Sequence, residues 1–539
     1  MRLGIDLDNT LICYDGVFLE CSKYLGFTPE TFKGGKREIK NYLHQRVDGE
    51  KNWQKLQGQV YGRWINNATL YSGAYRFLWR CKARGFSVEI ISHKSEYGHF
   101  DDENVPLRNV AIDFLTQAGI YSSNDQSMID NIQFCSSQEE KILCISEKNF
   151  DWFVDDLPEI FKSKQFPIGT KRIIFDPTGE KSLHNSDTSV SWSVIESRVL
   201  GDWTKLELKQ LALEVCKVRV DEVVSQEGRG NSGIFRVTLA DRVPTVLKIY
   251  PDDGQHNRLH SEYTGLELLN KCGIKQIVQR VACSPSLNVG MYQWIDGKPI
   301  GNPSTGDIVQ ALSWVSKLHA VRTVSEWRSF PSASAAVFSG IQLEEQIECR
   351  FSKLNKESVE SKELGEFLEG ELRPIADKIL KWGRTRWPKS RKFGQQLSLE
   401  ERTLSPSDFG FHNALRRNDG SIVFLDFEYF GWDDPVKLIV DFTLHPGMNL
   451  ANKLKTTWVH GALEIFGSGV RPRLEIMWPY LGICWCLILL NEFREDVWLR
   501  RTRASYRGPE KQNEIMLCQL EKSRNLLSWI NLNYREFPF

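Results

Sequence analysis

A change of pattern near residue 200 restricts the fold of this chain of 539 residues more than any other feature. Before it, short apolar runs alternate with longer helical patterns, the order typical of a parallel sheet covered by helices. The candidate strands are residues 3–7, 88–92, 150–154 and 172–175. Residues 176–205 are rich in Ser, Thr, Asp and Gly, which is typical of a surface connection between folding units. We therefore predict an α/β domain over residues 1–195 and a second domain over residues 205–539.

The second domain has its strands first and its helices afterwards. It begins with a helix, a hairpin containing glycine, a strand that carries Lys248, a helix that carries Glu262 and two further strands. The remainder is mostly helical and is interrupted by a loop and hairpin over residues 404–430. This order predicts an α+β architecture with a small β-rich lobe followed by a large helical lobe.

Composition argues against several classes of protein. Lys plus Arg equals Asp plus Glu at 69 each, so no overall charge draws the chain to nucleic acid or anionic lipid. The 12 Cys form no Cys-x-x-Cys pair, which favours reduced thiols. Asp6 and Asp8 interrupt the first apolar run, unlike a secretory signal. The most apolar segment, 477–490, is shorter than the roughly 20 residues of a spanning helix. We therefore expect a cytoplasmic globular protein without membrane insertion and without a nucleic-acid partner.

The first candidate strand ends in acidic and hydroxyl side chains. The segment GIDLDNTL places Asp6, Asp8 and Thr10 at the strand end, where ligands of open α/β sheets bind. One carboxylate can accept a phosphoryl group as an aspartyl phosphate, and a second can protonate the leaving oxygen and then deprotonate water. Mg²⁺ is needed because nucleophile and phosphate are both anionic. An acidic strand end followed by a turn is the alternative for this motif alone.

Further polar residues stand at or near the ends of the next strands. Ser92 ends the second strand, Lys141 precedes the third, and FDWFVDD ends the third with Asp155 and Asp156. A hydroxyl and an ammonium can hold phosphate oxygens, and the paired acids can complete an oxygen-rich Mg²⁺ shell. The sequence therefore predicts one phosphate and metal site at this edge of the sheet.

Together these motifs resemble the haloacid dehalogenase superfamily of phosphohydrolases over roughly residues 1–180. That superfamily carries a DxDxT strand, a Ser or Thr strand end, a Lys and a paired-acid strand in this order. The resemblance implies a Rossmann-like fold with a small helical cap over residues 15–75. It implies the following roles: nucleophile for Asp6, acid and base for Asp8, phosphate ligands for Thr10, Ser92 and Lys141, and metal ligands for Asp6, Asp8, Asp155 and Asp156. Lys94 and Lys148 are alternatives to Lys141, and a phosphate-binding module without turnover is the alternative for the domain.

A loop and hairpin in the second domain carry a second set of polar residues. In LSPSDFGFHNALRRNDGSIVFLDFEYFGWDDP, Asp408 and Asn413 lie five residues apart, and Asp426 ends the apolar run IVFL. Phosphoryl transfer from ATP needs a carboxylate that orients the acceptor hydroxyl, and an amide and a second carboxylate that hold Mg²⁺ on the phosphates. Asp408 is therefore the candidate base, and Asn413 and Asp426 are the candidate metal ligands. A polar hairpin with incidental acids is the alternative.

Residues upstream complete the pattern of an ATP site. In TVLKIY, Lys248 lies in an apolar strand from which its ammonium can reach ATP phosphates, and Glu262 follows on a helix where it can pair with Lys248. Gly228, Gly230 and Gly233 precede that strand, in a hairpin whose backbone amides can approach phosphates closely. Glycines alone more often mark only a turn, so the prediction depends on the order of glycines, Lys, Glu, Asp-x4-Asn and Asp.

This order resembles the aminoglycoside phosphotransferase and choline kinase branch of the kinase-like fold over nearly all of residues 205–500. LDFEYFGWDDP is similar to the metal-binding segment of choline and ethanolamine kinases. SDFGFHN departs from the family's usual His-Gly-Asp or His-Asn-Asp opening, because Pro406 and Ser407 stand in place of those residues. The departure keeps Asp408 but leaves a supporting hydrogen bond beside it unassigned.

The same resemblance implies two further roles. An adenine-binding hinge would lie near Gln293 and Trp294, and Asp441 would brace the catalytic loop. We interpret His319 and His412 as structural residues, and the aromatic residues over 424–432 as core packing rather than as a cage for a cationic acceptor.

The interpretation of the whole chain is a bifunctional phosphoryl-transfer enzyme that uses Mg²⁺ and ATP. One domain would phosphorylate a small hydroxyl metabolite, a sugar or an amino-alcohol, and the other would hydrolyse a phosphomonoester. The alternative is a regulatory protein in which one domain senses nucleotide or phosphate without turnover. A protein kinase is disfavoured because the chain has no HRD, DFG or APE series.

Overall fold

The computed structural model describes residues 1–100, 104–122, 127–179, 187–226, 232–240, 244–252, 256–357, 359, 361–498, 501 and 512–539. The chain folds into two compact units, the first built mainly from Met1–Leu211 and the second mainly from the residues that follow. The division falls within α9 (Lys205–Cys216), a few residues beyond the predicted boundary.

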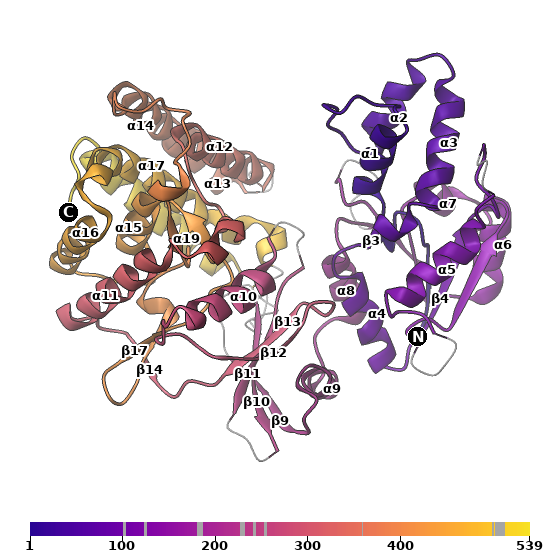
Figure 1. Cartoon of the computed structure of the whole chain (residues 1–539), viewed down its shortest axis with the longest axis horizontal. Coiled ribbons are helices and arrows are strands. Elements are labelled where there is room, and N and C mark those ends of the chain that lie inside the picture. The colour runs from indigo at the N-terminus through magenta and orange to yellow at the C-terminus, as the bar shows by residue number, and fades with distance from the viewer. Residues whose placement is uncertain are drawn as a thin grey trace. The chain divides into compact units, whose positions relative to one another are not determined.

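The first unit contains a six-stranded parallel sheet with the order β5-β4-β1-β6-β7-β8 (Figure 1). Its strands are β1 (Arg2–Ile5), β4 (Ser87–His93), β5 (Asn131–Cys135), β6 (Trp152–Asp155), β7 (Lys171–Phe175) and β8 (Thr188–Ser189). Alternate residues of a strand face opposite sides of the sheet, so Ile90 and Ile173 join one hydrophobic core while Ile91 and Ile174 join another. The predicted parallel sheet is confirmed, and β5 and β8 were not predicted.

Helices of the first unit form two groups (Figure 1). Three of them follow β1 within the segment predicted as a helical cap: α1 (Asp15–Tyr24), α2 (Lys36–His44) and α3 (Gly49–Tyr61), with the short hairpin strands β2 (Ile12–Cys13) and β3 (Thr69–Leu70) on either side. The others accompany the sheet: α4 (Ala74–Ala83), α5 (Leu107–Gln117), α6 (Gln138–Lys148), α7 (Pro158–Lys162) and α8 (Trp192–Leu200).

The segment predicted as a surface connection is partly built into the first unit. It contains β8 and α8, and the fully buried Trp192 donates from Nε1 to the carbonyl of Thr10 at 2.9 Å. The buried Arg80 of α4 holds Glu196 of α8 and Glu207 of α9, with Nη1 2.9 Å from Glu196 and Nε 3.0 Å from Glu207. The prediction was wrong for residues 187–200, because the apolar residues between its polar ones pack into the core.

The second unit begins with a five-stranded antiparallel sheet in the order β12-β13-β11-β10-β9. Its strands are β9 (Val220–Ser225), β10 (Gly233–Leu239), β11 (Thr245–Ile249), β12 (Arg280–Ser284) and β13 (Val289–Gln293), and α10 (Arg258–Lys271) lies between β11 and β12 in the chain. This is the small β-rich lobe that the sequence predicts, and β9 and β10 are the antiparallel strands before and after the predicted glycine turn, most of which lies outside the described residues.

The rest of the second unit is mostly helical, as predicted. Its helices are α11 (Thr305–Val321), α12 (Gly340–Glu357), α13 (Lys362–Phe367), α14 (Arg373–Arg386), α15 (Pro435–Leu444), α16 (Asn452–Phe466), α17 (Arg471–Leu489) and α19 (Gln512–Asn533). The short strands between them are β14 (Lys298–Pro299), β15 (Thr403–Ser405), β16 (Ala414–Arg416), β17 (Ile422–Phe424) and β18 (Gly431–Asp433). The strands β15 to β18 form the predicted hairpin region that carries the acids.

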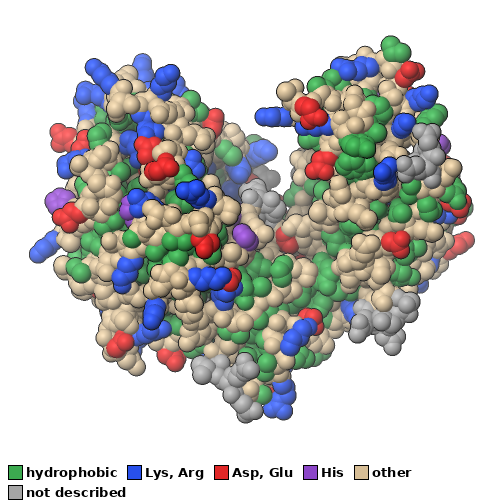
Figure 2. All heavy atoms as spheres, viewed as in Figure 1, with side chains coloured by type: hydrophobic (Ala, Val, Ile, Leu, Met, Phe, Trp, Pro, Cys, Tyr) green, Lys and Arg blue, Asp and Glu red, His purple; other side chains and the backbone are tan. Residues whose placement is uncertain are grey.

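One helical stretch among the described residues, Ser468–Phe493, is long and apolar enough to cross a membrane, and 78% of its 18-residue apolar part is buried inside the protein. It includes α17, whose side chains belong to the core of the helical lobe. Such burial is typical of a core helix, which is the predicted environment. On the surface, Figure 2 shows basic and acidic side chains interspersed on the face that it draws, as the equal numbers of the two charges suggest.

Candidate active sites

The first candidate site forms where β1 ends. Asp6 follows this strand directly, and its backbone N–H donates to the carbonyl of Val154 at 2.9 Å. Its carboxylate accepts from Lys141 Nζ at 2.6 Å and from Thr10 Oγ1 at 3.3 Å. Lys141 lies on α6 and also donates to Asp155 Oδ2 at 2.6 Å. One buried ammonium therefore joins carboxylates at the ends of two neighbouring strands.

Three carboxylates of this site are close enough to share one cation. Ligand oxygens of Asp6, Asp155 and Asp156 lie within 4.8 Å of one another. Burial, together with the charges of Asp155 and Asp156, raises the pKa of Asp6 to about 8 against the opposing charge of Lys141. A divalent cation favours the ionised carboxylate and prefers oxygen ligands, so this set of donors fits Mg²⁺.

Ser92 and the lysines considered as alternatives to Lys141 have different surroundings in the structure. The Ser92 hydroxyl is buried at the end of β4, and among the described residues it has no hydrogen-bond partner. A buried polar group in that state is unusual, and a phosphate oxygen would satisfy it. Lys148 pairs with Glu89 at 2.5 Å and takes no part in the site. Lys94 does take part, but its partner is Asp8.

Asp8 is held by donors on both of its carboxylate oxygens. Tyr14 Oη donates to Oδ1 at 2.7 Å, and Lys94 Nζ donates to Oδ2 at 2.7 Å. The helices α2 and α3 lie close by, because Lys94 Nζ is 5.0 Å from the ring centroid of Tyr61, whose hydroxyl accepts from Lys36 Nζ at 3.0 Å. Tyr14 and Lys94 therefore fix the orientation of the Asp8 carboxylate.

The second candidate site is centred on Lys248 of β11. Its Nζ lies 2.7 Å from Glu262 Oε2 of α10 and 2.5 Å from Asp426 Oδ1. Glu262 also accepts the backbone N–H of Phe427 at 3.2 Å, so it fastens the loop that carries Asp426 as well as the lysine. Asp426 has a φ of 62°, a left-handed conformation that Asp adopts more readily than most residues. The predicted Lys–Glu pair therefore forms next to a predicted metal ligand.

Glu428 belongs to this site although the sequence analysis did not single it out. It lies 3.1 Å from Lys248 Nζ and accepts from Ser232 Oγ at 2.6 Å and Arg258 Nη1 at 2.7 Å. Burial opposes its ionisation, yet the charges of Lys248 and Arg258 hold the pKa of Glu428 at about 2. Burial raises the pKa of Asp426 to about 7 despite Lys248. The signal in the sequence was a second acid two residues after Asp426.

The acids around Lys248 also fit a divalent cation. Ligand oxygens of Glu262, Asp426 and Glu428 lie within 4.8 Å of one another. The predicted ligand Asn413 ends the 3₁₀ turn η5 (Phe411–Asn413), and its carbonyl accepts the backbone N–H of Leu425 at 2.9 Å. That bond places Asn413 beside the strand end that carries Asp426. Carboxylate and amide oxygens are suitable Mg²⁺ ligands.

The candidate base Asp408 follows β15. Its Oδ2 accepts from Asn413 Nδ2 at 3.2 Å, and the same Nδ2 donates to its backbone carbonyl at 3.0 Å. Its Oδ1 lies 2.9 Å from His412 Nε2 and 3.4 Å from His445 Nε2. Burial alone would raise the pKa of Asp408, but His412, His445 and Asn413 hold it well below its usual range. His412, which we interpreted as only structural, therefore contacts the candidate base.

The remaining predicted positions belong to the β-rich lobe or lie outside the described residues. Gln293 ends β13, and its backbone N–H and that of Trp294 bond to Gln279 and Pro244 carbonyls, so neither N–H is available to an adenine. Gly233 begins β10. Gly228 and Gly230 lie outside the described residues.

Asp441 contacts the loop that carries Asp408 through another residue. It accepts from Trp485 Nε1 at 2.9 Å and pairs with Lys437 at 3.0 Å. Lys437 in turn donates to Ser407 Oγ at 3.3 Å, beside Asp408. The bracing implied by the resemblance would therefore pass through Lys437.

Comparisons with known proteins were made by sequence and by structure. No protein-family model matches the chain, and no curated protein matches it. Solved structures similar to it include a spectinomycin phosphotransferase in complex with ADP and spectinomycin, at 12% identity and a TM-score of 0.40 over 59% of this chain and 98% of that one. An ethanolamine kinase from Plasmodium vivax matches at 13% identity and a TM-score of 0.40, over 60% of this chain and 89% of that one.

A choline kinase from Cryptosporidium parvum matches at 14% identity and a TM-score of 0.37, over 58% of this chain and 91% of that one. These similar structures are kinases of small molecules. Their TM-scores lie below 0.5, so functional conclusions about this chain rest on its own residues.

Proposed function

We propose that this chain is a bifunctional phosphoryl-transfer enzyme of small molecules. Its second unit would be a kinase that transfers the γ-phosphoryl group of ATP to a hydroxyl group of a sugar or an amino-alcohol. Its first unit would be a Mg²⁺-dependent phosphomonoesterase that works through an aspartyl phosphate. The arrangement that carries the kinase proposal is Lys248 held between Glu262 and Asp426, with Asp408 and Asn413 on the adjoining loop.

In the kinase step Asp408 would orient the acceptor hydroxyl and accept its proton as the oxygen attacks the γ-phosphorus. The bond between that phosphorus and the β–γ bridging oxygen breaks, and ADP leaves. Lys248, oriented by Glu262, would hold phosphate oxygens. Mg²⁺ on the phosphates would neutralise the charge that develops, with Asn413 and Asp426 as its protein ligands.

In the phosphatase step an Asp6 oxygen would attack phosphorus while protonated Asp8 gives its proton to the leaving oxygen, so that the bond from phosphorus to that oxygen breaks and the alcohol leaves. Water would then attack the aspartyl phosphate while Asp8 takes its proton, and this releases inorganic phosphate and restores Asp6. Lys141, Thr10 and the Ser92 hydroxyl would hold the phosphate oxygens. Mg²⁺ beside Asp6, Asp155 and Asp156 would reduce the repulsion between the nucleophile and the phosphate.

A kinase assay in the Asp6→Asn background would test the first activity, because that substitution stops a phosphatase that could erase the product. Mg²⁺-ATP consumption is measured against sugars, amino-alcohols and aminoglycosides, and labelled phosphate is followed into small molecules and into protein. Transfer to one acceptor that is lost in Asp408→Asn, but kept with Asp377→Asn at an exposed control position, is the expected result. Binding of ATP without transfer to any acceptor would instead favour the sensing alternative.

A panel of phosphomonoesters would test the second activity. Wild-type chain with Mg²⁺ is expected to release phosphate from some of them, Asp6→Asn to release none, and the exposed control Asp113→Asn to match wild type. Equal turnover by wild type and Asp6→Asn would overturn the phosphatase proposal.

The free state of all twelve cysteines agrees with the further proposal of a cytoplasmic protein.

A further inference from the structure

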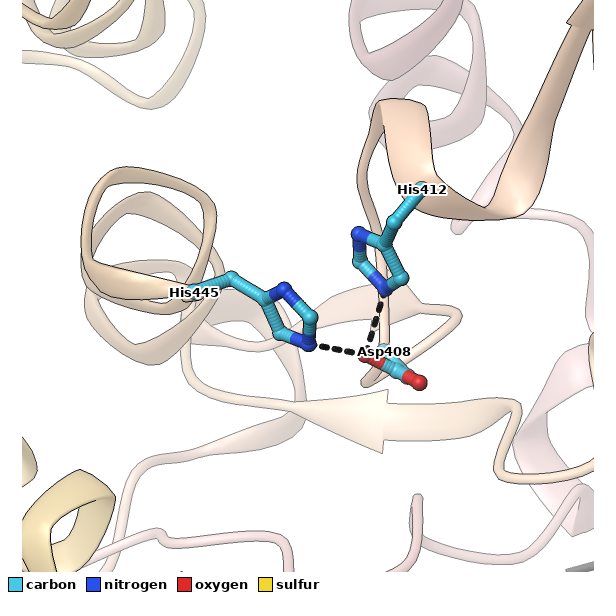
Figure 3. Close-up of side chains that lie close together, drawn as sticks. All are labelled: Asp408, His412 and His445. Carbon is cyan, nitrogen blue, oxygen red and sulfur yellow. Dashed lines mark hydrogen bonds and ion pairs between the residues drawn. The ribbon is translucent and has the colours of Figure 1, made fainter. Parts of the chain in front are cut away.

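Two histidine rings stack beside the candidate base of the kinase unit (Figure 3). His412 comes from η5, and His445 follows the end of α15. Their ring centroids are 3.7 Å apart with an angle of 4° between the rings. Figure 3 shows both Nε2 atoms directed at the same carboxylate oxygen of Asp408, while the other oxygen points away from the rings.

A metal ion is the first explanation to consider, since the three ligand atoms lie within 4.8 Å of one another. Such an ion would need an Nε2 atom without a proton on each ring.

The hydrogen bond on the far side of His445 opposes a metal ion. The backbone N–H of Gly447 donates to His445 Nδ1 at 3.1 Å. That contact makes Nδ1 the acceptor, so in the neutral ring Nε2 carries the proton. An Nε2–H group cannot bind a metal, but it can donate to Asp408.

The surrounding residues hold both rings in place. The His445 ring lies edge-on to Trp485, with centroids 4.8 Å apart. A Cβ atom at Gly410 would lie 2.8 Å from His412 Nδ1, and one at Gly447 would lie 3.1 Å from the His445 ring. Because Gly410 and Gly447 have no side chains, the backbone can pass close to both imidazoles.

From this geometry we infer that His412 and His445 are positioning residues. His412 donates from Nε2 to Oδ1 of Asp408 at 2.9 Å, His445 directs its Nε2–H at the same oxygen from 3.4 Å, and together they direct Oδ2 to the acceptor hydroxyl. Pro406 and Ser407 stand where the resembled family has the residues that precede the base, and this leaves a supporting hydrogen bond unassigned. The two histidines would supply that support from residues that follow the base in the chain. The inference rests on the proposed kinase function of this unit.

Replacement of each imidazole by a ring without a donor tests this role in the full chain with Asp6→Asn. His412→Phe, His445→Phe and their combination are compared with His445→Gln, which retains an N–H donor, and with His460→Phe at an exposed control position. We expect kcat to fall about 10- to 100-fold in the double variant, with little change in the KM for ATP. We expect His445→Gln to retain more of kcat than His445→Phe. A double variant with unchanged kcat, or equal losses in His445→Gln and His445→Phe, would overturn the inference.

Histidine ¹⁵N spectra decide the hydrogen bonding without any turnover. The expected spectrum shows His445 protonated at Nε2 and not at Nδ1, with the His412 and His445 signals both shifted by Asp408→Asn and the His460 signal unmoved. A His445 ring protonated at Nδ1, or signals indifferent to Asp408→Asn, would refute the positioning role. If the chain transfers phosphate to no acceptor, the proposed function fails, whereas these spectra still decide whether the histidines hold Asp408.

Discussion

Replacement of Lys141 by Met is expected to destabilise the first unit by about 3–5 kcal/mol at pH 7, the usual cost of removing one partner from a buried ion pair. The Lys141 side chain is 1% exposed and lies 2.6 Å from both Asp6 and Asp155. Met has a similar length, so the substitution removes the charge with little loss of packing. Among the described residues, Lys141 is the only cation that forms an ion pair with either carboxylate, and the substitution removes it.

The destabilisation should also depend on pH. The pKa of Asp6 is raised to about 8, so between its unfolded value near 4 and pH 8 the folded chain binds more protons than the unfolded chain, and stability falls as the pH rises. In the wild type this loss ends near pH 8. Without Lys141 the pKa of Asp6 rises further, so the loss continues above pH 8 by about 1.4 kcal/mol per pH unit. The difference in unfolding free energy between the wild type and Lys141→Met is therefore larger at pH 9 than at pH 6.

Hydrogen exchange read by mass spectrometry on peptides from β1 and β4 would measure this effect, because it reports the opening of the first unit separately from the second. EDTA keeps the site free of divalent cations, and the exposed Lys164→Met serves as the control. A difference below about 1 kcal/mol, or one that is equal at pH 6 and pH 9, would refute the reasoning.

Three other substitutions test the second unit. Glu262→Gln weakens the placement of Lys248 and should lower kcat/KM for ATP about 30-fold, equivalent to about 2 kcal/mol, while phosphatase turnover by the first unit stays unchanged. Burial lowers the pKa of His445 to about 4. Between pH 6.5 and pH 4 only the unfolded chain binds the proton, so the unit should lose stability as the pH falls through this range. The melting temperature of His445→Gln should depend less on pH over the same range. Gly431→Ala would place a Cβ 2.5 Å from neighbouring backbone and should cost about 1–3 kcal/mol in thermal unfolding, unlike Gly301→Ala, whose Cβ has open space.

The strand pattern and the order of polar residues were readable from the sequence because neighbouring residues set them. Alternation along a strand and an acid at its end are local features, so the parallel sheet and the position of Asp6 after β1 could be predicted. Lys248 and Glu262 were likewise identified from a strand and the helix after it, and the structure places them 2.7 Å apart. Residues 187–200 were misread, because a run rich in Ser hid the apolar positions that pack against the sheet.

Contacts between distant segments had no local signal, and only the tertiary structure decided them. Lys94 was considered as a phosphate ligand, but the packing of β4 beside β1 makes it the partner of Asp8. His445 follows a helix far along the chain from Asp408, and no spacing in the sequence connects the two. The sequence determines which residue types each element offers at its end. Which side chains meet across two elements depends on how those elements pack, because a hydrogen bond needs atoms within about 3 Å and no residue spacing encodes that distance.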